Sequence, residues 1–155
     1  MVRDFQPIGP NASQRSSAPV RILVVDDFEP WRRSVCSMLA GNTEFQVVGE
    51  ATDGLEAIQK AQTLRPDLIL LDIGLPKLNG IEAAKQIRDV VPGTKILFLT
   101  AINDKGLVQA ALDSGALGYV LKIDAHGQLL AALAVVLGGD NFVSSGIEGA
   151  GSRDH

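Results

Sequence analysis

The sequence has little of what would indicate a secreted, membrane-spanning or nucleic-acid-binding protein. It contains a single cysteine, Cys36, which excludes an intramolecular disulfide. Its formal net charge is -4 at pH 7, so no basic face is expected to bind nucleic acid directly. No apolar run approaches the roughly 18–20 residues of a membrane span, and residues 1–19 lack the apolar segment of a secretory signal. A cytoplasmic protein without a membrane partner is therefore expected.

Length and composition predict one globular domain between two short segments. The 155 residues are 46% hydrophobic and 21% charged, as in soluble globular proteins. Residues 1–19 are rich in Ser, Pro, Gln and Asn and are predicted to form a disordered leader. The domain is expected over residues 20–138. Residues 139–155 are rich in Gly and Ser, and we expect a flexible C-terminal tail there, with no room for a second domain.

The domain alternates between short apolar runs and amphipathic segments. The run Leu68–Leu71 is apolar without alternation, which is typical of a strand covered on both faces. Pro30, the pair Asp53 and Glu56, and Asn79 mark the starts of three helices. The expected strands cover residues 21–27, 45–51, 67–72, 95–100 and 118–122, each followed by a helix. Five such units predict an α/β fold: a doubly wound parallel sheet with helices on both faces.

Polar residues of a catalytic type stand at the carboxyl ends of four of these strands. They are Asp26 and Asp27, then Asp72, Thr100 and Lys122. Because the carboxyl ends of parallel strands meet at one edge of a sheet, these side chains are expected to converge. Three carboxylates attract a hard divalent cation, most plausibly Mg²⁺, and a lysine and a hydroxyl beside them suit a phosphoryl oxygen. The set predicts phosphoryl transfer onto an aspartate.

Each of these residues taken alone has a simpler interpretation. A lone Thr100 or Lys122 is more often a solvent contact at a strand end, and Asp26 or Asp27 is also suited to cap the following helix. The joint pattern places such residues at four strand ends and none within a strand. That pattern favours one shared site.

The motifs around these residues resemble the receiver domain of two-component response regulators. The resemblance covers roughly residues 20–138 and rests on the stretches "VVDD", "LLDIGLPKLNG", "FLTA" and "GYVLK". The spacing is also that of the family, with 45 residues from Asp27 to Asp72, 28 on to Thr100 and 22 on to Lys122. The wording of "DIGLPKLNG" and "GALGYVLKIDA" is most similar to the NarL/FixJ subfamily. Members of that subfamily usually carry a helix-turn-helix DNA-binding domain, which is not expected in this chain.

The resemblance implies a fold and a phosphoacceptor. The fold is a flavodoxin-like sheet of five parallel strands in the order 2-1-3-4-5. A sensor histidine kinase or phosphotransfer protein would phosphorylate Asp72. Asp27, Asp72 and the backbone carbonyl of Gly74 would bind Mg²⁺ (or Mn²⁺) directly, and Asp26 would bind it through water.

The resemblance also assigns roles to three residues on the last two strands. Lys122 and Thr100 would hold the phosphoryl group. Tyr119 would be the switch aromatic that turns inward when Thr100 moves; the alternative for Tyr119 is a half-buried aromatic on an edge strand. These roles are expectations for the structure to examine.

Four functions compete for this sequence. The first is a receiver that relays a phosphoryl signal to a downstream protein by protein–protein contact, without being an enzyme. The second is the receiver part of a DNA-binding regulator that lacks its helix-turn-helix domain. The third is a phosphatase of the haloacid-dehalogenase type, which needs a second Asp two residues after its nucleophile; that position is Gly74. The fourth is a receiver that is never phosphorylated, which the intact set of five residues disfavours.

Two further expectations concern the duration of the signal and self-association. In this fold, the residues two positions after the acceptor and after the hydroxyl flank the path of an attacking water; here they are Gly74 and Ile102, which offer it no polar side chain. The last helix, 125–137, is apolar on nearly all faces, so self-association as a homodimer or docking of a partner is expected there. The alternative is a small-residue helix with mild exposure.

Overall fold

The structure is a computed structural model that describes residues 18–147. Most of the predicted leader, residues 1–17, and the end of the predicted tail, residues 148–155, lie outside the described residues. Within residues 18–147, no helix has both the length and the apolar character needed to cross a membrane.

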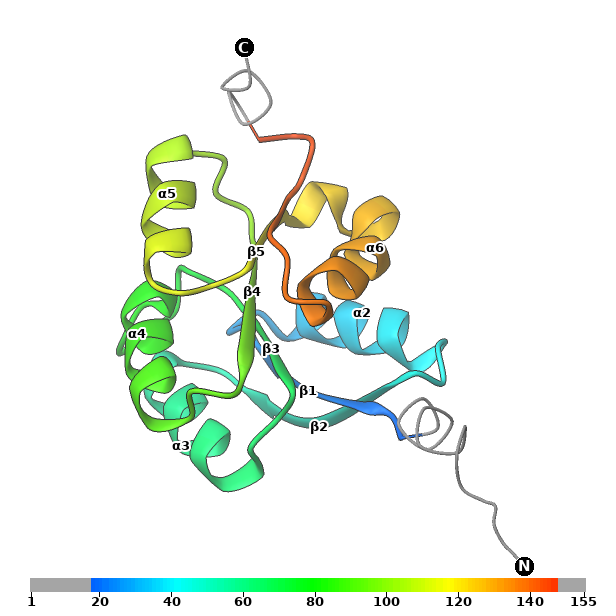
Figure 1. Ribbon diagram of the computed structural model, residues 1–155, viewed down its shortest axis with the longest axis horizontal. Coiled ribbons are helices and arrows are strands. Elements are labelled where there is room, and N and C mark those ends of the chain that lie inside the picture. Colours follow the sequence, from blue (N-terminus) through cyan, green and yellow to red (C-terminus); the bar gives the residue numbers. More distant parts are fainter. Residues whose placement is uncertain (1–17, 148–155) are drawn as a thin grey trace, which may run out of the picture.

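Strands and helices alternate along the described chain, as the sequence predicted. The strands are β1 (Val20–Val25), β2 (Phe45–Ala51), β3 (Leu68–Leu71), β4 (Lys95–Thr100), β5 (Gly118–Leu121) and β6 (Phe142–Val143). The helices are α2 (Glu29–Ala40), α3 (Gly54–Leu64), α4 (Gly80–Val90), α5 (Lys105–Asp113) and α6 (Ala125–Leu137), with a 3₁₀ turn at Lys122–Asp124. Figure 1 shows their arrangement.

The sheet confirms the predicted strand order and adds one strand to it. The order is β2-β1-β3-β4-β5-β6, and every neighbouring pair is parallel. The added strand β6 lies in the segment 139–155, for which the sequence predicted only a tail. Its two residues are too few to show a strand period, and the strand forms because the outer edge of β5 offers it a partner.

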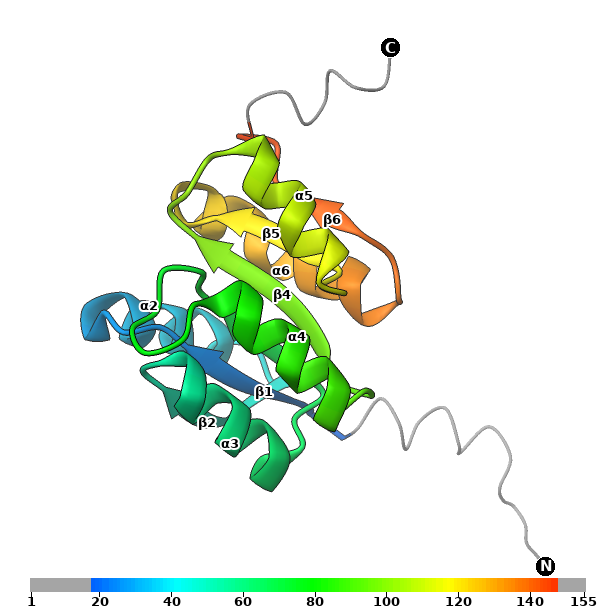
Figure 2. The same ribbon diagram turned by 90° about the vertical axis from the view of Figure 1, so that its left-hand side faces the viewer.

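Helices cover both faces of the sheet and enclose two apolar layers. In Figures 1 and 2, α3, α4 and α5 lie on one face, and α2 and α6 lie on the other. Alternate residues of each strand point into opposite layers: Leu23 and Ile69 into the first, Ile22 and Leu70 into the second. Because both layers are buried, the central strands are apolar on both faces, as the run "LILL" of β3 predicted.

Two of the predicted helix starts depend on side-chain caps. Asp53 Oδ1 accepts a hydrogen bond of 2.8 Å from the Glu56 N–H, and Glu56 in turn accepts one from the Thr52 N–H. Asn79 Oδ1 accepts from the Glu82 N–H at the start of α4. Each cap satisfies a backbone donor that has no partner within the helix, which fixes where the chain turns from loop to helix after a strand.

The residues that follow α6 pack on the outer edge of β5. We call residues 142–147 the C-terminal strap. Ser144 is completely buried: its N–H donates to the Tyr119 carbonyl at 2.9 Å, and its Oγ accepts from the Leu121 N–H at 3.1 Å. Ile147, at the end of the strap, is buried against the layer formed with α3, α4 and α5. The strap is therefore an integral part of the fold.

The two adjacent serines of the strap provide a matched test of its contribution to stability. Ser144→Ala leaves the buried Leu121 N–H without its acceptor, so it is expected to lower the free energy of unfolding by about 1–3 kcal/mol. Ser145 is exposed and bonds only to Gln128, so Ser145→Ala is expected to change it by less than about 0.5 kcal/mol. Urea denaturation measures both; equal losses would contradict the buried role of Ser144.

Candidate functional site

The five predicted strand-end residues meet at the carboxyl edge of the sheet. Asp26 and Asp27 follow β1, Asp72 follows β3, Thr100 ends β4 and Lys122 follows β5. The strands are in register there, with Val25 opposite Leu71 and Leu71 opposite Phe98. Parallel strands bring their carboxyl ends to one edge of the sheet, which is how positions far apart in the sequence come together.

The three aspartates form a cluster of oxygen ligands. One carboxylate oxygen from each of Asp26, Asp27 and Asp72 lies within 4.8 Å of the others. Asp26 and Asp72 are buried and Asp27 is exposed, so the cluster opens toward solvent on one side. Hard divalent cations such as Mg²⁺ and Mn²⁺ take carboxylate and carbonyl oxygens. The donor set therefore fits such an ion.

Lys122 partly neutralises this cluster. Its Nζ lies 2.7 Å from Asp26 Oδ2 and 3.3 Å from Asp72 Oδ2, and its side chain is 20% exposed. Burial lowers the pKa of Lys122, but the hydrogen bond and charge of Asp26 and the charge of Asp72 outweigh that effect and raise it above its usual value. The ammonium group is therefore a permanent positive charge beside Asp72.

The surroundings of the Asp26 carboxyl disfavour its charged form, whereas those of Lys122 favour the charged ammonium group. Burial raises the pKa of Asp26, although hydrogen bonds from Lys122 and from the Phe28 N–H lower it, and the charge of Asp72 raises it further. The Phe28 N–H lies 2.8 Å from Asp26 Oδ1. Two carboxylates this close at a buried edge repel each other, so they favour any cation placed between them.

Asp72 has its carboxylate fixed on both oxygens. Oδ1 accepts a hydrogen bond of 2.8 Å from the Ile73 N–H, and Oδ2 faces Lys122. The residue is 8% exposed, so it is partly desolvated yet reachable. The loop that follows is tight, because a Cβ on Gly80 would collide with the Asp72 carbonyl oxygen. Gly74, by contrast, is exposed with open space around it.

Thr100 and Tyr119 are joined through the backbone of Ile102. Thr100 is fully buried and its Oγ1 accepts from the Ile102 N–H at 3.3 Å. The Tyr119 hydroxyl donates to the Ile102 carbonyl at 2.7 Å, and its ring lies 6.4 Å from that of Phe98. Tyr119 is fully buried rather than half-buried, and burial raises its pKa to about 12. The Tyr119 ring is therefore buried in the apolar layer, and its role as a switch aromatic stays a prediction.

The structure adds residues that the sequence did not predict. Lys122 Nζ lies 5.7 Å from the centre of the Trp31 ring, a cation–π contact from the first turn of α2. Phe28 and Ile123 are 61% and 88% exposed beside the site, so its rim is apolar. The only sequence signal for the rim was two large apolar residues directly after strand-end polar ones. Nothing in the sequence indicated the contact of Trp31, because it depends on how α2 packs against the sheet.

The chain is similar to known response regulators in sequence and structure. It is 37% identical over 115 residues to the response regulator protein VraR of Staphylococcus saprophyticus, covering 74% of this chain and 55% of VraR. A crystal structure of a two-component response regulator of the LuxR family from Aurantimonas sp. SI85-9A1 matches with a TM-score of 0.83 and 31% identity. That match covers 89% of this chain and 100% of the other.

The comparisons do not support the expectation that direct contact with nucleic acid is absent. A structure of two RcsB dimers bound to two parallel DNAs matches with a TM-score of 0.77 and 27% identity, covering 87% of this chain and 67% of that one. The chain spans about half the length of the curated relatives it matches. The expectation that nucleic acid is not bound rested on the net charge of this sequence alone. That charge gives no information on the other half of such relatives, so the expectation was too broad.

The family match extends over nearly the whole described domain. Residues 22–134 match the family model of the response regulator receiver domain. The matched range runs from β1 into α6 and includes all five strand-end residues of the site. The chain belongs to the family of response regulator receiver domains.

Proposed function

We propose that Asp72 accepts a phosphoryl group from a partner histidine kinase or phosphotransfer protein, and that the change is relayed by protein–protein contact. The observation that carries the proposal is the position of Lys122 Nζ, 3.3 Å from Asp72 Oδ2, beside a cluster of three carboxylates. Receiver domains are signalling proteins rather than classical enzymes. The chemistry proposed here changes the protein itself.

In the transfer step, an oxygen of Asp72 attacks the phosphorus carried by the partner's histidine. The new O–P bond forms as the N–P bond breaks, and the imidazole nitrogen keeps the electron pair and is protonated. Asp72 is suited to this role because it is buried but reachable, and because the Ile73 N–H orients its other oxygen. A fixed carboxylate loses little freedom when it reaches the phosphorus.

Charge on the transferred group is stabilised by the residues around Asp72. The Lys122 ammonium group is close enough to exchange its contact with Asp72 for one with a phosphoryl oxygen. The buried Thr100 hydroxyl supplies a neutral donor. Mg²⁺ or Mn²⁺, when bound, would neutralise further charge on the phosphoryl group, and Asp26, Asp27, Asp72 and the Gly74 carbonyl are the groups that would hold it.

The same geometry argues against the two other chemical interpretations. A phosphatase of the haloacid-dehalogenase type needs an acid where this chain has Gly74, which carries no side chain. A receiver that is never phosphorylated would not need Lys122 between Asp26 and Asp72 at the price of burying three charges. A phosphoacceptor needs both features.

A second candidate concerns the output and is compatible with the first. The chain spans about half of its curated relatives, and the similar RcsB protein was solved bound to DNA. We infer that this receiver regulates a DNA-binding output. Two routes to DNA are possible: binding by this domain itself, or binding by a separate output that this domain regulates. Measuring the affinity of the chain for duplex DNA, with and without a phosphoryl mimic, distinguishes them, because only the first route requires measurable affinity of the chain alone.

Replacing the acceptor tests the central claim. Asp72→Asn keeps the shape of the side chain but removes the nucleophilic carboxylate, so phosphorylation by acetyl phosphate with Mg²⁺ is expected to fall to background. The fold should persist, because the change also removes one of three repelling charges. Mass spectrometry measures the phosphoryl group, and Asp89→Asn, an exposed change on α4, is the control. Phosphorylation persisting in Asp72→Asn would refute the assignment of Asp72.

The phosphorylated form is expected to live longer than that of a receiver with amide or acidic side chains at positions 74 and 102. Gly74 offers no side chain to orient an attacking water, and Ile102 packs against the apolar layer. Gly74→Asn combined with Ile102→Glu is expected to shorten the lifetime by about tenfold to a hundredfold. A phosphate-release assay measures it.

The control for the lifetime test is another exposed glycine. Gly93→Asn also adds an amide where a Cβ meets nothing within 4 Å, and it is expected to leave the lifetime unchanged. The single variant Gly74→Asn separates the effect of water orientation from any disturbance at the partly buried Ile102. An unchanged or longer lifetime in the double variant would show that these two positions do not control hydrolysis.

A second copy of the chain is the proposed partner of α6. The buried side of this helix includes Leu129 and Leu133, while Leu130 is 46% exposed beside the exposed Ala131 and Ala134. The similar RcsB protein forms dimers. Leu130→Glu is expected to prevent self-association measured by sedimentation, whereas Val90→Glu on the opposite face of the sheet is not. A wild-type protein that remains monomeric at high concentration, with and without a phosphoryl mimic, would exclude this partner.

A further inference from the structure

The C-terminal strap is attached to the edge of β5 through its first three residues, and its end is buried against the apolar layer. Its first residue, Phe142, donates from its N–H to the Leu117 carbonyl at 3.0 Å. Ser144 then bonds to both Tyr119 and Leu121 of β5, and Ile147 is 4% exposed against the apolar layer. The strap thus covers the outer edge of β5 in the way that an added strand covers the edge of a sheet.

Gly146 of the strap lies between two loops of the phosphoacceptor site. Its carbonyl accepts a hydrogen bond of 3.0 Å from Asn103 Nδ2, and its N–H donates to Asp124 Oδ2 at 3.1 Å. A Cβ on Gly146 would lie 2.6 Å from Asp124 Oδ2, so a side chain here would displace the Asp124 carboxylate. One peptide unit of the strap is therefore fixed from both sides.

The two residues that hold Gly146 lie two or three positions after the two residues proposed to hold the phosphoryl group. Asn103 lies three residues after Thr100, in the loop between β4 and α5, and Asp124 lies two residues after Lys122, in the 3₁₀ turn. The Thr100 hydroxyl also bonds to the backbone of this loop, at the Ile102 N–H. The strap consequently contacts the loop that follows Thr100 and the turn that begins with Lys122, whose Nζ lies 3.3 Å from Asp72 Oδ2.

We propose that the outer edge of β5 is a docking surface for the chain's own residues 142–147, and that phosphorylation of Asp72 weakens their docking. This inference rests on the proposed function. A phosphoryl group gives Thr100 and Lys122 a new acceptor, so each shifts toward Asp72 and moves the loop that follows it. Because Asn103 and Asp124 belong to different loops, unequal shifts lengthen at least one of the two bonds to Gly146.

The coupling must act in both directions. If phosphorylation weakens docking of the strap by some factor, then a docked strap disfavours the phosphorylated state by the same factor. A variant with a loosened strap should therefore bind a phosphoryl mimic more tightly. Both directions are measurable on the full chain.

Hydrogen exchange tests the forward direction. Beryllofluoride with Mg²⁺ serves as the phosphoryl mimic, and fluorine NMR reports whether it is bound. The amides of Ser144 and Gly146 are expected to exchange at least tenfold faster when it is bound, while the amide of Val24 in the central strand β1 stays unchanged. In Asp72→Asn the mimic should neither bind nor alter exchange at the strap.

The outcomes separate the two proposals. Bound beryllofluoride with unchanged exchange at Ser144 and Gly146 overturns the docking proposal and leaves the phosphoacceptor role intact. Failure of the wild-type protein to bind beryllofluoride overturns both. If the amides of the strap lose protection only in samples that sedimentation shows to be dimeric, a second copy competes for the edge of β5 and the coupling within one chain is wrong.

A pair of glycine variants tests the reverse direction. Gly146→Ala forces Asp124 away from the strap, and it is expected to lower the dissociation constant for beryllofluoride by threefold or more. Gly93→Ala makes the same chemical change where a Cβ meets nothing, and it is expected to behave like the wild type. Equal affinities in Gly146→Ala, Gly93→Ala and the wild type would overturn the reciprocal coupling.

Discussion

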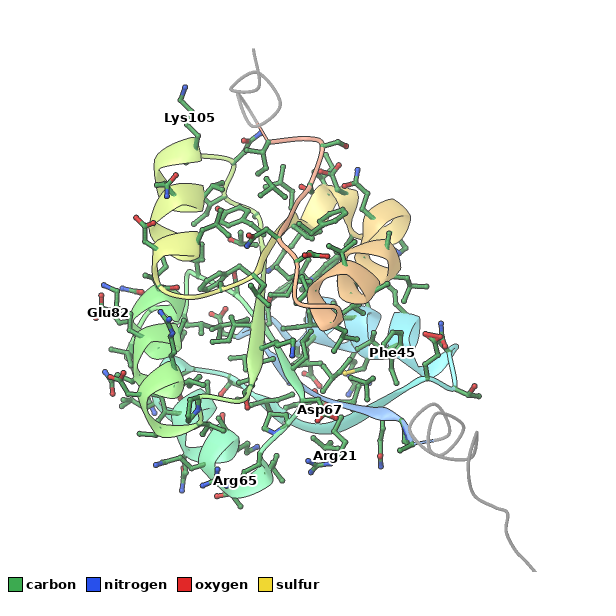
Figure 3. All side chains as sticks on the ribbon, viewed as in Figure 1. Arg21, Phe45, Arg65, Asp67, Glu82 and Lys105 are labelled. Atoms are coloured by element: carbon green, nitrogen blue, oxygen red, sulfur yellow. The ribbon has the colours of Figure 1, made fainter. Side chains whose placement is uncertain are left out.

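The ion pairs of one ammonium group with two buried carboxylates organise this molecule's functional edge. Lys122 Nζ lies between Asp26 and Asp72, and without it the edge would concentrate negative charge in a poorly solvated place. Lys122 directly follows β5, whereas Asp26 and Asp72 follow β1 and β3. The site is therefore complete only when these strands have formed one sheet. Figure 3 shows the side chains that fill the space between this sheet and its helices, with the labelled Glu82 and Lys105 at the periphery.

The sheet makes this arrangement possible because all its strands run in the same direction. The apolar residues within its strands are buried and cannot contact a partner. At its carboxyl edge, by contrast, each of four strands contributes one polar residue or a pair of them. The helices contribute through their starts, where Asp53 and Asn79 fix the loops that leave this edge. Trp31 adds a ring beside Lys122 from the other side. Stability and chemistry are therefore separated spatially: burial provides the first and the strand ends provide the second.

Much of the fold and the site's residues could be predicted from the sequence, for physical reasons that differ by residue. Asp72 and Lys122 were predictable because a polar residue directly after an apolar run marks a strand end, and parallel strands bring their ends together. Ser144 was not, because a buried serine among Gly and Ser has no local pattern to distinguish it from a tail residue. The contact of Trp31 with Lys122 was not predictable either, because it depends on packing between distant segments. The metal and the phosphoryl donor are proposals that rest on the chemistry of the residue set and on resemblance.

The shortness of β6 limits aggregation through the edge of the sheet. An uncovered edge strand presents a row of unpaired backbone N–H and C=O groups, to which any extended chain can add, and such edges promote aggregation. β6 covers the edge of β5 with only two residues, and the chain then turns inward to bury Ile147. A cover this brief offers too few free backbone groups to recruit another strand in its turn. The strap therefore terminates the sheet as well as extending it, and a chain shortened before Phe142 would expose β5 as an adhesive edge.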